Sequence, residues 1–407
     1  MSTEFEDIDG TQSMNRDPID SGRVLIAAMI LGTTGVALFA ILPLLVGALV
    51  DYLALTPRQS GFVAAADIIG MAAGNLAAFF WIRRISMRKM AWLAVSIIAL
   101  ANLLCITTSS FAMILSLRLL IGLAEGTCLA LAYAILGRSS HADRNYAIFI
   151  VVIMTFGALN LYILSQLAQI YGAIVFFLDL AIIAAVAGLF VRYIPKRGAV
   201  HESREDASHA IVEAVLPVGP AVIVLLAANL VYFVGQGGVW AYLERIGIAH
   251  ELSVDQVAIG LSMSLITGVA GALATTVINL RFGRAAPLGA AILIAIACVL
   301  VLIWNVTVAT FFVAVGLWNF VNNFGHPYLL GYMASIDRSG RYVVASGGMQ
   351  TAGMGVGPAI AALIISSPTY INVLWLGLAC FIITLAMFMP IMILYRGTEA
   401  SSTEPVS

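Results

Sequence analysis

The sequence predicts an all-α membrane protein with twelve transmembrane helices, arranged as two six-helix halves that are parallel repeats. Composition, the spacing of apolar stretches and an internal repeat predict this fold. Of 407 residues, 61% are hydrophobic and 10% are charged, and the mean hydropathy is +1.02. Soluble proteins are about 25% charged. A bilayer core of about 30 Å requires about 20 apolar residues per helix, so the chain can form twelve such helices joined by short loops.

The composition also excludes several classes of function. The net charge is −1, from 20 basic and 21 acidic residues, so no basic surface is available for binding a nucleic acid. The sequence contains no GxxxxGK[ST] loop and neither HExxH nor GxSxG, so we expect neither an ATP-driven pump nor an enzyme. The four cysteines lie singly in apolar stretches, and no metal or other cofactor is expected.

Six apolar stretches precede the longest polar segment and six follow it. The first six span 24–50, 58–81, 90–108, 112–137, 146–168 and 172–194, and the second six span 217–243, 257–279, 286–305, 307–334, 343–366 and 370–395. The polar segment 195–216 is therefore expected to link a first half, 24–194, to a second half, 217–396. Residues 1–23 are expected to form a disordered cytoplasmic tail, and residues 397–407 a second cytoplasmic tail.

The basic residues predict the orientation of these spans. Placing both termini in the cytoplasm puts seventeen of the 20 Lys and Arg residues on that side, whereas Arg58 and Arg245 lie outside and Arg118 lies within a span. Basic loops are retained in the cytoplasm. We therefore expect a multi-pass protein of the cell inner (plasma) membrane, surrounded by the lipid bilayer and monomeric.

An internal repeat supports the two halves independently of hydropathy. A shift of 197 residues aligns the segment from Leu55 with the segment from Leu252 without a gap. The same shift pairs three residues of the first half with identical residues of the second. These pairs are Gln59 with Gln256, Gly74 with Gly271, and Arg84 with Arg281. Repeats of the same orientation are typical of transporters built from two similar halves.

Two local motifs resemble those of the major facilitator superfamily, and the resemblance covers residues 24–396. In that family a Gly near the end of the second helix is followed by Asp-Arg-x-Gly-Arg-Arg/Lys. Here Gly74 is followed by the basic loop Arg83–Lys89, in which Arg83 stands at the position of the Asp. In the fourth span, Arg118 begins the family's Arg-x-x-x-Gly pattern. The resemblance implies the twelve-helix fold and solute transport by alternating access.

The fourth span is also similar to narrower groups within that superfamily. Glu125 follows Arg118 by seven positions, as in organic-anion symporters of the vesicular-glutamate and sugar-acid type and in spinster-type lipid transporters. The first and seventh spans lack the Arg that those anion symporters use, so anion specificity is not carried over. A Gly-rich run ending in Pro358 lies in the eleventh span, whereas the family's antiporters carry it in the fifth, which disfavours drug antiport.

Ionisable residues inside the spans are the candidates for proton coupling. A charge at the bilayer centre costs about 2.5 to 3.5 kcal/mol on insertion scales, so each needs a function or a partner. Arg118 and Glu125 share one face of their helix because seven residues nearly complete two turns, and Asp67 lies at an intermediate depth. We expect Glu125, Asp67 and Arg118 to bind and release a proton together. Alternatively, the two carboxylates simply neutralise Arg118 and hold two helices together.

Amide and aromatic side chains replace these charges in the second half, where the repeat pairs Glu125 with Asn322. In the tenth span, spacings of three, four and seven put Asn319, Asn322 or Asn323, and His326 on one helix face, and the seventh span has a similar face. Amides supply both donors and acceptors and rings supply stacking area, so these faces suit a neutral or aromatic solute. The alternative is that the amides bond neighbouring helices to each other. The substrate-binding candidates are Asn229, Tyr232, Gln236, Trp240, Asn319, Asn322, Asn323, His326, Tyr162 and Gln166, with Gln169 beside the last.

These observations favour a proton-coupled secondary active transporter whose partners are protons and a small organic solute. Uptake by symport is the favoured direction, and the alternative is proton-antiport efflux of drugs or metabolites. A second alternative is a transport-dead membrane receptor or scaffold.

The orientation can be tested by labelling. A single cysteine introduced between residues 195 and 215 should react with a membrane-impermeant thiol reagent in inverted vesicles, because the basic loops place this linker in the cytoplasm. The extent of labelling is compared between inverted vesicles and intact cells. Labelling in intact cells would show that the orientation is reversed.

Overall fold

The computed structural model describes residues 18–82, 84–196, 220–278, 281–336 and 341–394, and all regular secondary structure in these ranges is helical. A short 3-10 helix, Pro18–Asp20, precedes the first half. That half comprises α1 (Gly22–Asp51), α2 (Pro57–Trp81), α3 (Met87–Ile106), α4 (Phe111–Leu136), α5 (Ala142–Tyr171) and α6 (Ile174–Val191). The second comprises α8 (Pro220–Ala249), α9 (Val254–Ile278), α10 (Ala285–Trp304), α11 (Val308–Ile336), α12 (Arg341–Ile364) and α13 (Ile371–Leu394).

The twelve helices confirm the fold class expected from the sequence. Each expected span coincides with one helix to within a few residues, and the largest difference is at α8, which continues to Ala249 beyond the expected end at 243. The expected disordered tail 1–23 is described only from residue 18, and its last part is ordered instead, because it forms the 3-10 helix and the first two residues of α1. The rest of that tail, the tail 397–407 and nearly all of the expected linker lie outside the described residues.

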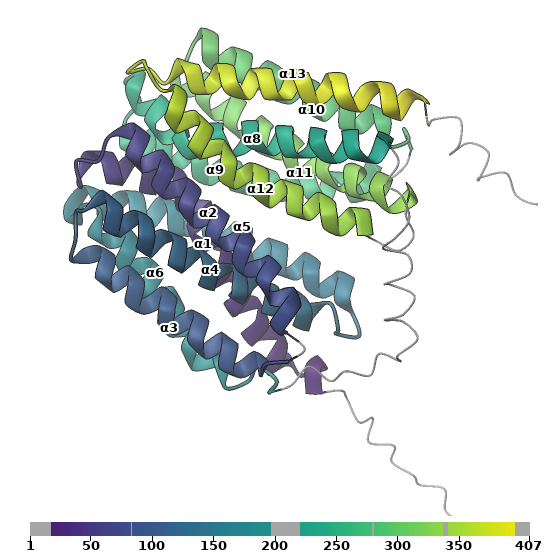
Figure 1. Ribbon diagram of the computed structural model, residues 1–407. Helices are drawn as coiled ribbons and strands as arrows, with labels where there is room; N and C mark the ends of the chain where they lie inside the picture. The colour runs from purple at the N-terminus through teal and green to yellow at the C-terminus, as the bar shows by residue number, and fades with distance from the viewer. Residues whose placement is uncertain (1–17, 83, 197–219, 279–280, 337–340, 395–407) are drawn as a thin grey trace, which may run out of the picture.

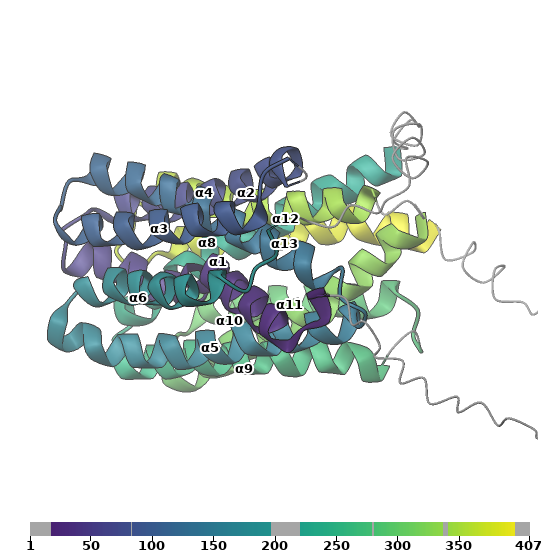
Figure 2. The ribbon, with the colours of Figure 1, turned by 90° about the horizontal axis from the view of Figure 1, so that it is seen from below.

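The helices form two groups that lie side by side in Figure 1. Figure 2, the view from below, shows α5 of the first group running along α9 of the second. In the first group α2 packs against α4 and α3 against α6, and in the second α9 packs against α11 and α10 against α13. These pairs correspond under the repeat, so both halves have the same arrangement. The two halves meet where α2 contacts α12, α5 contacts α9 and α1 contacts α8.

The repeat extends to the capping of equivalent helices. At the start of α2, the Thr56 hydroxyl accepts a hydrogen bond from the Gln59 backbone, and the Gln59 side chain accepts one from the Thr56 backbone. At the start of α9, Ser253 and Gln256 make the same reciprocal pair. A capping box satisfies backbone donors that have no partner within the helix. The aligned glutamines therefore fix where both helices begin.

The aligned glycines allow equivalent helices to pack closely. A Cβ atom on Gly74 would overlap the backbone carbonyl of Leu123, and a Cβ atom on Gly271 would overlap that of Phe320. Leu123 and Phe320 are themselves separated by 197 residues, so the two close approaches are copies. Small residues at such contacts allow helix backbones to approach within a membrane.

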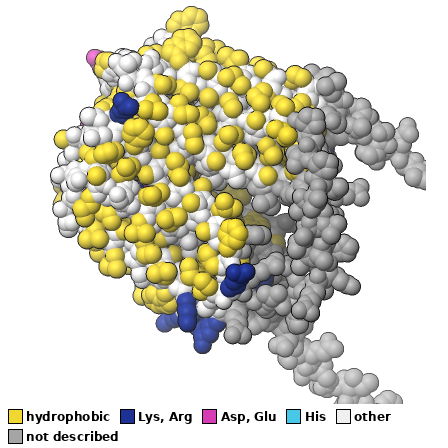
Figure 3. All heavy atoms as spheres, viewed as in Figure 1, with side chains coloured by type: hydrophobic (Ala, Val, Ile, Leu, Met, Phe, Trp, Pro, Cys, Tyr) yellow, Lys and Arg dark blue, Asp and Glu magenta, His cyan; other side chains and the backbone are white. Residues whose placement is uncertain are grey.

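Eleven helices in the described ranges are long and apolar enough to cross a bilayer. Apolar side chains cover most of the face seen in Figure 3, as expected for a surface in contact with lipid. The helix α12 is not among the eleven. It packs against α8 of its own half and α2 of the other, so its more polar residues have protein neighbours on both sides.

Candidate functional site

The charged residues of the first half form one buried cluster. Arg118 Nη1 donates to Asp67 Oδ2 over 2.9 Å, and Arg118 Nη2 donates to Asn102 Oδ1 over 2.6 Å. The guanidinium carbon lies 5.6 Å from the centre of the Phe177 ring, a cation–π contact. Asp67 is 1% exposed and Arg118 is fully buried. Helices α2, α3 and α6 thus each contribute one residue around the single positive charge of α4.

Close packing of α2 on α4 brings these charges together. A Cβ atom on Gly122 would overlap the Asp67 carbonyl, and a Cβ atom on Gly126 would overlap the Met71 carbonyl. The two helix backbones are therefore in direct contact beside the charges. A short Asp side chain can then reach the guanidinium, because no side chain lies between the two helices at this level.

Glu125 completes the cluster from the α4 side. Its side chain is 1% exposed and lies within hydrogen-bonding reach of the Asp67 carboxyl. Its Oε1 atom has no hydrogen-bond partner, and neither has Arg118 Nε. With both carboxyls ionised, the cluster carries one net negative charge. The three residues singled out in the sequence thus lie in one cluster, in which Asp67 is bonded to Arg118 and the Glu125 carboxyl lies beside that of Asp67.

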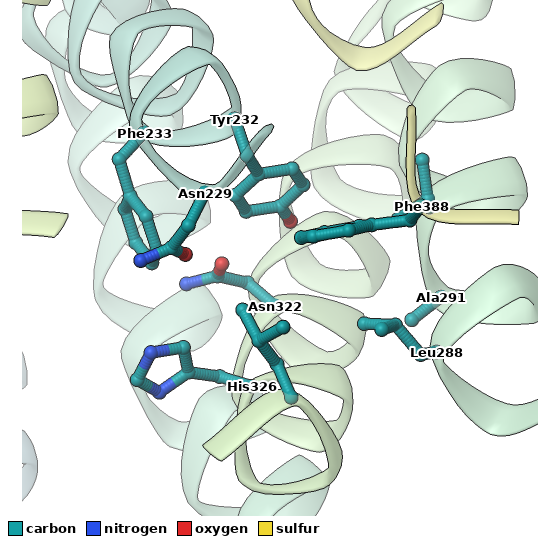
Figure 4. Close-up of a pocket in the computed structure, with 10 residues that line it drawn as sticks. Asn229, Tyr232, Phe233, Leu288, Ala291, Asn322, His326 and Phe388 are labelled. Atoms are coloured by element: carbon teal, nitrogen blue, oxygen red, sulfur yellow. The ribbon is translucent and has the colours of Figure 1, made fainter. Parts of the chain in front are cut away.

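The second half contains a small pocket between α8, α10, α11 and α13, shown in Figure 4. The amides of Asn229 and Asn322 lie beside each other there, with His326 on one side and the Tyr232 ring on the other. Asn229 Nδ2 donates to Ser346, at 2.8 Å from its carbonyl and 3.0 Å from its hydroxyl, which directs Asn229 Oδ1 away from α12. The pocket volume of about 20 Å³ suits one water molecule.

Three polar side-chain atoms around this pocket have no hydrogen-bond partner among the described residues. They are Asn229 Oδ1, Asn322 Oδ1 and His326 Nε2. Gln236 Oε1, two turns along α8 from Asn229, is unpartnered as well. Buried polar atoms are normally bonded, so this group of atoms is unusual.

The other two amides of α11 have structural partners. Asn323 Nδ2 donates to the side-chain oxygen of Asn319 over 2.8 Å, and Asn319 Nδ2 lies 3.3 Å from the Ser264 hydroxyl of α9. The sequence grouped these amides on one helix face with Asn322 and His326. The structure separates them, because Asn319 and Asn323 face α9 whereas Asn322 and His326 face α8.

Two further candidates bond the halves to each other. Trp240 Nε1 donates to the Phe39 carbonyl of α1 over 3.0 Å, and the rings of these two residues are stacked. Gln166 Nε2 donates to Asp255 Oδ1 of α9 over 2.7 Å, and Gln169 donates to the same oxygen over 3.0 Å. Tyr162 is 44% exposed. These contacts close the space between the halves at one end.

An ion-pair network at the same end was missed by sequence reasoning. Arg245 of α8 donates to both carboxylate oxygens of Asp51 at the end of α1, each over 2.6 Å, and also to the neighbouring Glu244. Glu244 is 5% exposed and fits against Gly47, where a Cβ atom would overlap its carboxylate. The Tyr242 hydroxyl adds a bond of 2.8 Å to the Pro57 carbonyl. We call Asp51, Glu244 and Arg245 the interhalf ion triad.

The chain matches the Major Facilitator Superfamily over residues 24–335, whereas no curated protein matches it. Among solved structures, it is similar to the nucleoside transporter NupG (12% identity, 91% of this chain, 99% of that one, TM-score 0.71). It is also similar to a D-xylose-proton symporter (12% identity, 90% of this chain, 97% of that one, TM-score 0.73). A third similar structure is a bacterial homologue of the human lysosomal transporter Spinster (14% identity, 96% of this chain, 100% of that one, TM-score 0.69).

The match covers most of the chain, so the protein belongs to the Major Facilitator Superfamily, as the sequence motifs indicated. It is therefore a multi-pass membrane transporter and not an enzyme. The structural similarities, at 12% to 14% identity, establish the fold alone.

The interhalf ion triad predicts a conformational effect of Arg245→Ala. The substitution removes both bonds to Asp51 and leaves Glu244 buried without a counter-charge, so the ends of α1 and α8 should separate. Electron paramagnetic resonance between spin labels at Tyr52 and Val254 should report a larger population at long distance.

Arg58→Ala provides the matched control for this measurement. Arg58 lies at the same end, and its guanidinium contacts the Phe62 ring of its own helix. Its removal should leave the distance distribution unchanged. Equal distributions in the native protein and in Arg245→Ala would show that the triad does not hold this end closed.

Proposed function

We propose that this protein is a proton-coupled secondary transporter of a small organic solute, and that Asp67, Arg118 and Glu125 bind the coupled proton. The main support is that two fully buried carboxyl groups lie close to each other, and that one of them, Asp67, is bonded to the single Arg of the cluster. Two carboxylates in contact repel each other, so a proton shared between them relieves the repulsion. The proton belongs to the cluster, because the strongly interacting carboxyls titrate together.

Protonation changes the net charge of the cluster from minus one to zero. An uncompensated charge is unfavourable in a low-dielectric interior, so the neutral cluster is compatible with closure of the protein around it. Glu125 is the candidate proton carrier, because its Oε1 atom has no hydrogen-bond partner that requires the carboxyl group to be charged. Asp67 keeps the direct bond to Arg118.

The contacts between the halves support an inward-open assignment of this conformation. The interhalf ion triad, the Gln166–Asp255 bond and the Tyr242–Pro57 bond all lie at the end expected to face outward from the distribution of basic residues. Figure 3 shows a recess at the right edge of the described surface, between the two groups of helices.

We assign both termini to the cytoplasm, and the protein to the cell inner membrane as a monomer.

The unpartnered acceptors of the second half support a solute that carries hydrogen-bond donors. Gln236 Oε1 and Asn322 Oδ1 are buried without partners, and an N–H or O–H group of a solute would satisfy them. The neighbouring rings of Tyr232 and Phe233 supply apolar contact. A small neutral or aromatic solute with amino or hydroxyl groups complements these residues best, and it would bind after the pocket, which has room for one water molecule in this conformation, has widened.

Uptake by symport is the favoured direction and antiport efflux is the alternative. In symport, a proton gradient directed into liposomes drives solute accumulation, whereas in antiport it drives solute out. A receptor or scaffold would show neither. Solute-dependent proton movement therefore distinguishes the three functions.

Glu125→Gln tests the proton-binding role. The substitution permanently imitates the protonated carboxyl, so solute binding and counterflow should persist while pH-driven accumulation falls to the level of empty liposomes. Counterflow and pH-driven transport are measured on the same preparation. Asp67→Asn is examined beside it, because the cluster shares its proton.

Arg118→Ala is the matched comparison within the cluster. It leaves two buried carboxyls without a counter-charge, and a loss of folded protein corresponding to about 3 to 5 kcal/mol is expected. If Glu125→Gln and Asp67→Asn both retain full pH-driven accumulation, the cluster is structural and the proposed coupling is wrong.

Asn322→Ala tests solute recognition by the second half. If Asn322 Oδ1 accepts a bond from the solute, the substitution should weaken solute affinity by about 1 to 3 kcal/mol with normal yield of folded protein. The affinity is measured by calorimetry with a solute identified in a thermal-shift screen. Asn319→Ala serves as the control, since its bonds to Asn323 and Ser264 predict lower thermal stability with unchanged affinity.

A further inference from the structure

A second cavity approaches the charged cluster from the end closed by the interhalf ion triad. It has a volume of about 510 Å³ and lies within the first half, where the ends of α1, α3, α5 and α6 meet. Its mouth is formed by loop residues, among them Tyr52, Thr108 and Tyr171. Half-exposed tyrosines and a Thr hydroxyl form a polar rim, so we call this cavity the outer pocket.

The floor of the outer pocket is formed by two buried residues, Cys105 and Phe177. Each is 1% exposed. The Phe177 ring lies directly against Arg118, with 5.6 Å between the ring centre and the guanidinium carbon. The Cys105 thiol lies close to the same guanidinium. One ring and one thiol therefore separate the outer pocket from the proposed proton-binding cluster.

The ionisable groups around this floor come from several helices. Asp67 of α2 and Glu125 of α4 lie on the inner side, and Arg118 lies between them and the ring. Cys128 of α4 adjoins Glu125. On α6, Asp179 accepts a bond of 2.9 Å from Asn160 of α5 and lies two residues beyond Phe177. Phe177 and Cys105 thus lie between the outer pocket and the Arg118 side of these carboxyls.

A coupled transporter requires such a separation. If water filled a continuous path from the outer pocket to Asp67 and Glu125, hydronium could transfer a proton to these carboxylates whichever way the halves faced. The same proton could then leave on the other side when the halves opened there. Protons would cross the membrane without solute and the gradient would be lost.

We propose that Phe177, with Cys105, is the barrier that keeps water of the outer pocket away from the Asp67–Arg118–Glu125 cluster. The ring is held in place by the cation it covers, because the face of an aromatic ring attracts a guanidinium. The proton-leak part of this inference rests on the proposed function of the same cluster, whereas the barrier to water does not.

Phe177→Ala tests the barrier with two measurements. In liposomes without solute, an imposed pH gradient should collapse at least about tenfold faster than with the native protein, equivalent to about 1.4 kcal/mol in the barrier. In a variant whose other three cysteines are replaced by Ala, Cys105 should react faster with a small water-soluble thiol reagent added to the outer side.

Matched variants separate the barrier from a general packing defect. Phe176→Ala removes an equally buried ring from the neighbouring position of α6, which does not line the outer pocket, and should cause neither effect. Phe177→Tyr keeps the ring and should remain tight to protons. Phe177→Val removes less side-chain volume than Phe177→Ala and should give a smaller proton leak. It replaces the alanine variant if that variant does not fold.

The two measurements distinguish failure of the barrier from failure of the proposed function. Faster Cys105 labelling with a faster pH collapse supports both. Faster labelling without a faster collapse supports the barrier and contradicts proton binding by the cluster. Unchanged labelling in Phe177→Ala, or in Phe177→Val if it is used instead, overturns the barrier.

Discussion

A single buried guanidinium organises the first half of this transporter. Arg118 has no exposed surface, and an isolated charge in such a position is strongly unfavourable. The charge is tolerated because an Asp, an Asn and an aromatic ring from three other helices surround it. The glycines that allow α2 to contact α4 are therefore as necessary to the cluster as its charged residues, since Asp67 would otherwise not reach Arg118.

The two halves have the same backbone arrangement and different chemistry. Equivalent glycines and capping boxes give equivalent helix contacts, yet the position of Glu125 is occupied by Asn322. An amide cannot exchange a proton in the physiological range, so the second half cannot duplicate the proposed proton site. It offers unpartnered hydrogen-bond acceptors instead. This asymmetry is the basis for assigning proton binding and solute recognition to different halves.

The sequence predicted the twelve helices well because length and apolarity determine membrane spans. It also identified Asp67, Arg118 and Glu125, since charges within apolar spans are rare. Asn102 and Phe177 could not be recognised, because an amide and a ring in an apolar helix are ordinary until their neighbours are known. The interhalf ion triad was missed for a related reason: its three residues lie near helix ends, where charges are common.

The amides of α11 show the limit of helical periodicity as a guide. Spacings of three and four residues place side chains on one broad face, but two neighbouring helices can share that face. Here Asn319 and Asn323 face α9, whereas Asn322 and His326 face α8. Only the positions of the neighbouring helices decide which amides bond to protein and which remain available.

The composition of α12 affects how the chain is inserted into the membrane during synthesis. Among the described residues, eleven helices have the length and apolar composition to cross a bilayer, and α12 is not one of them. Its native neighbours α2 and α8 precede it in the chain and are made earlier. We therefore expect stable integration of α12 to require these two helices to be in place, which would make the contact between the halves part of biogenesis as well as of the transport cycle.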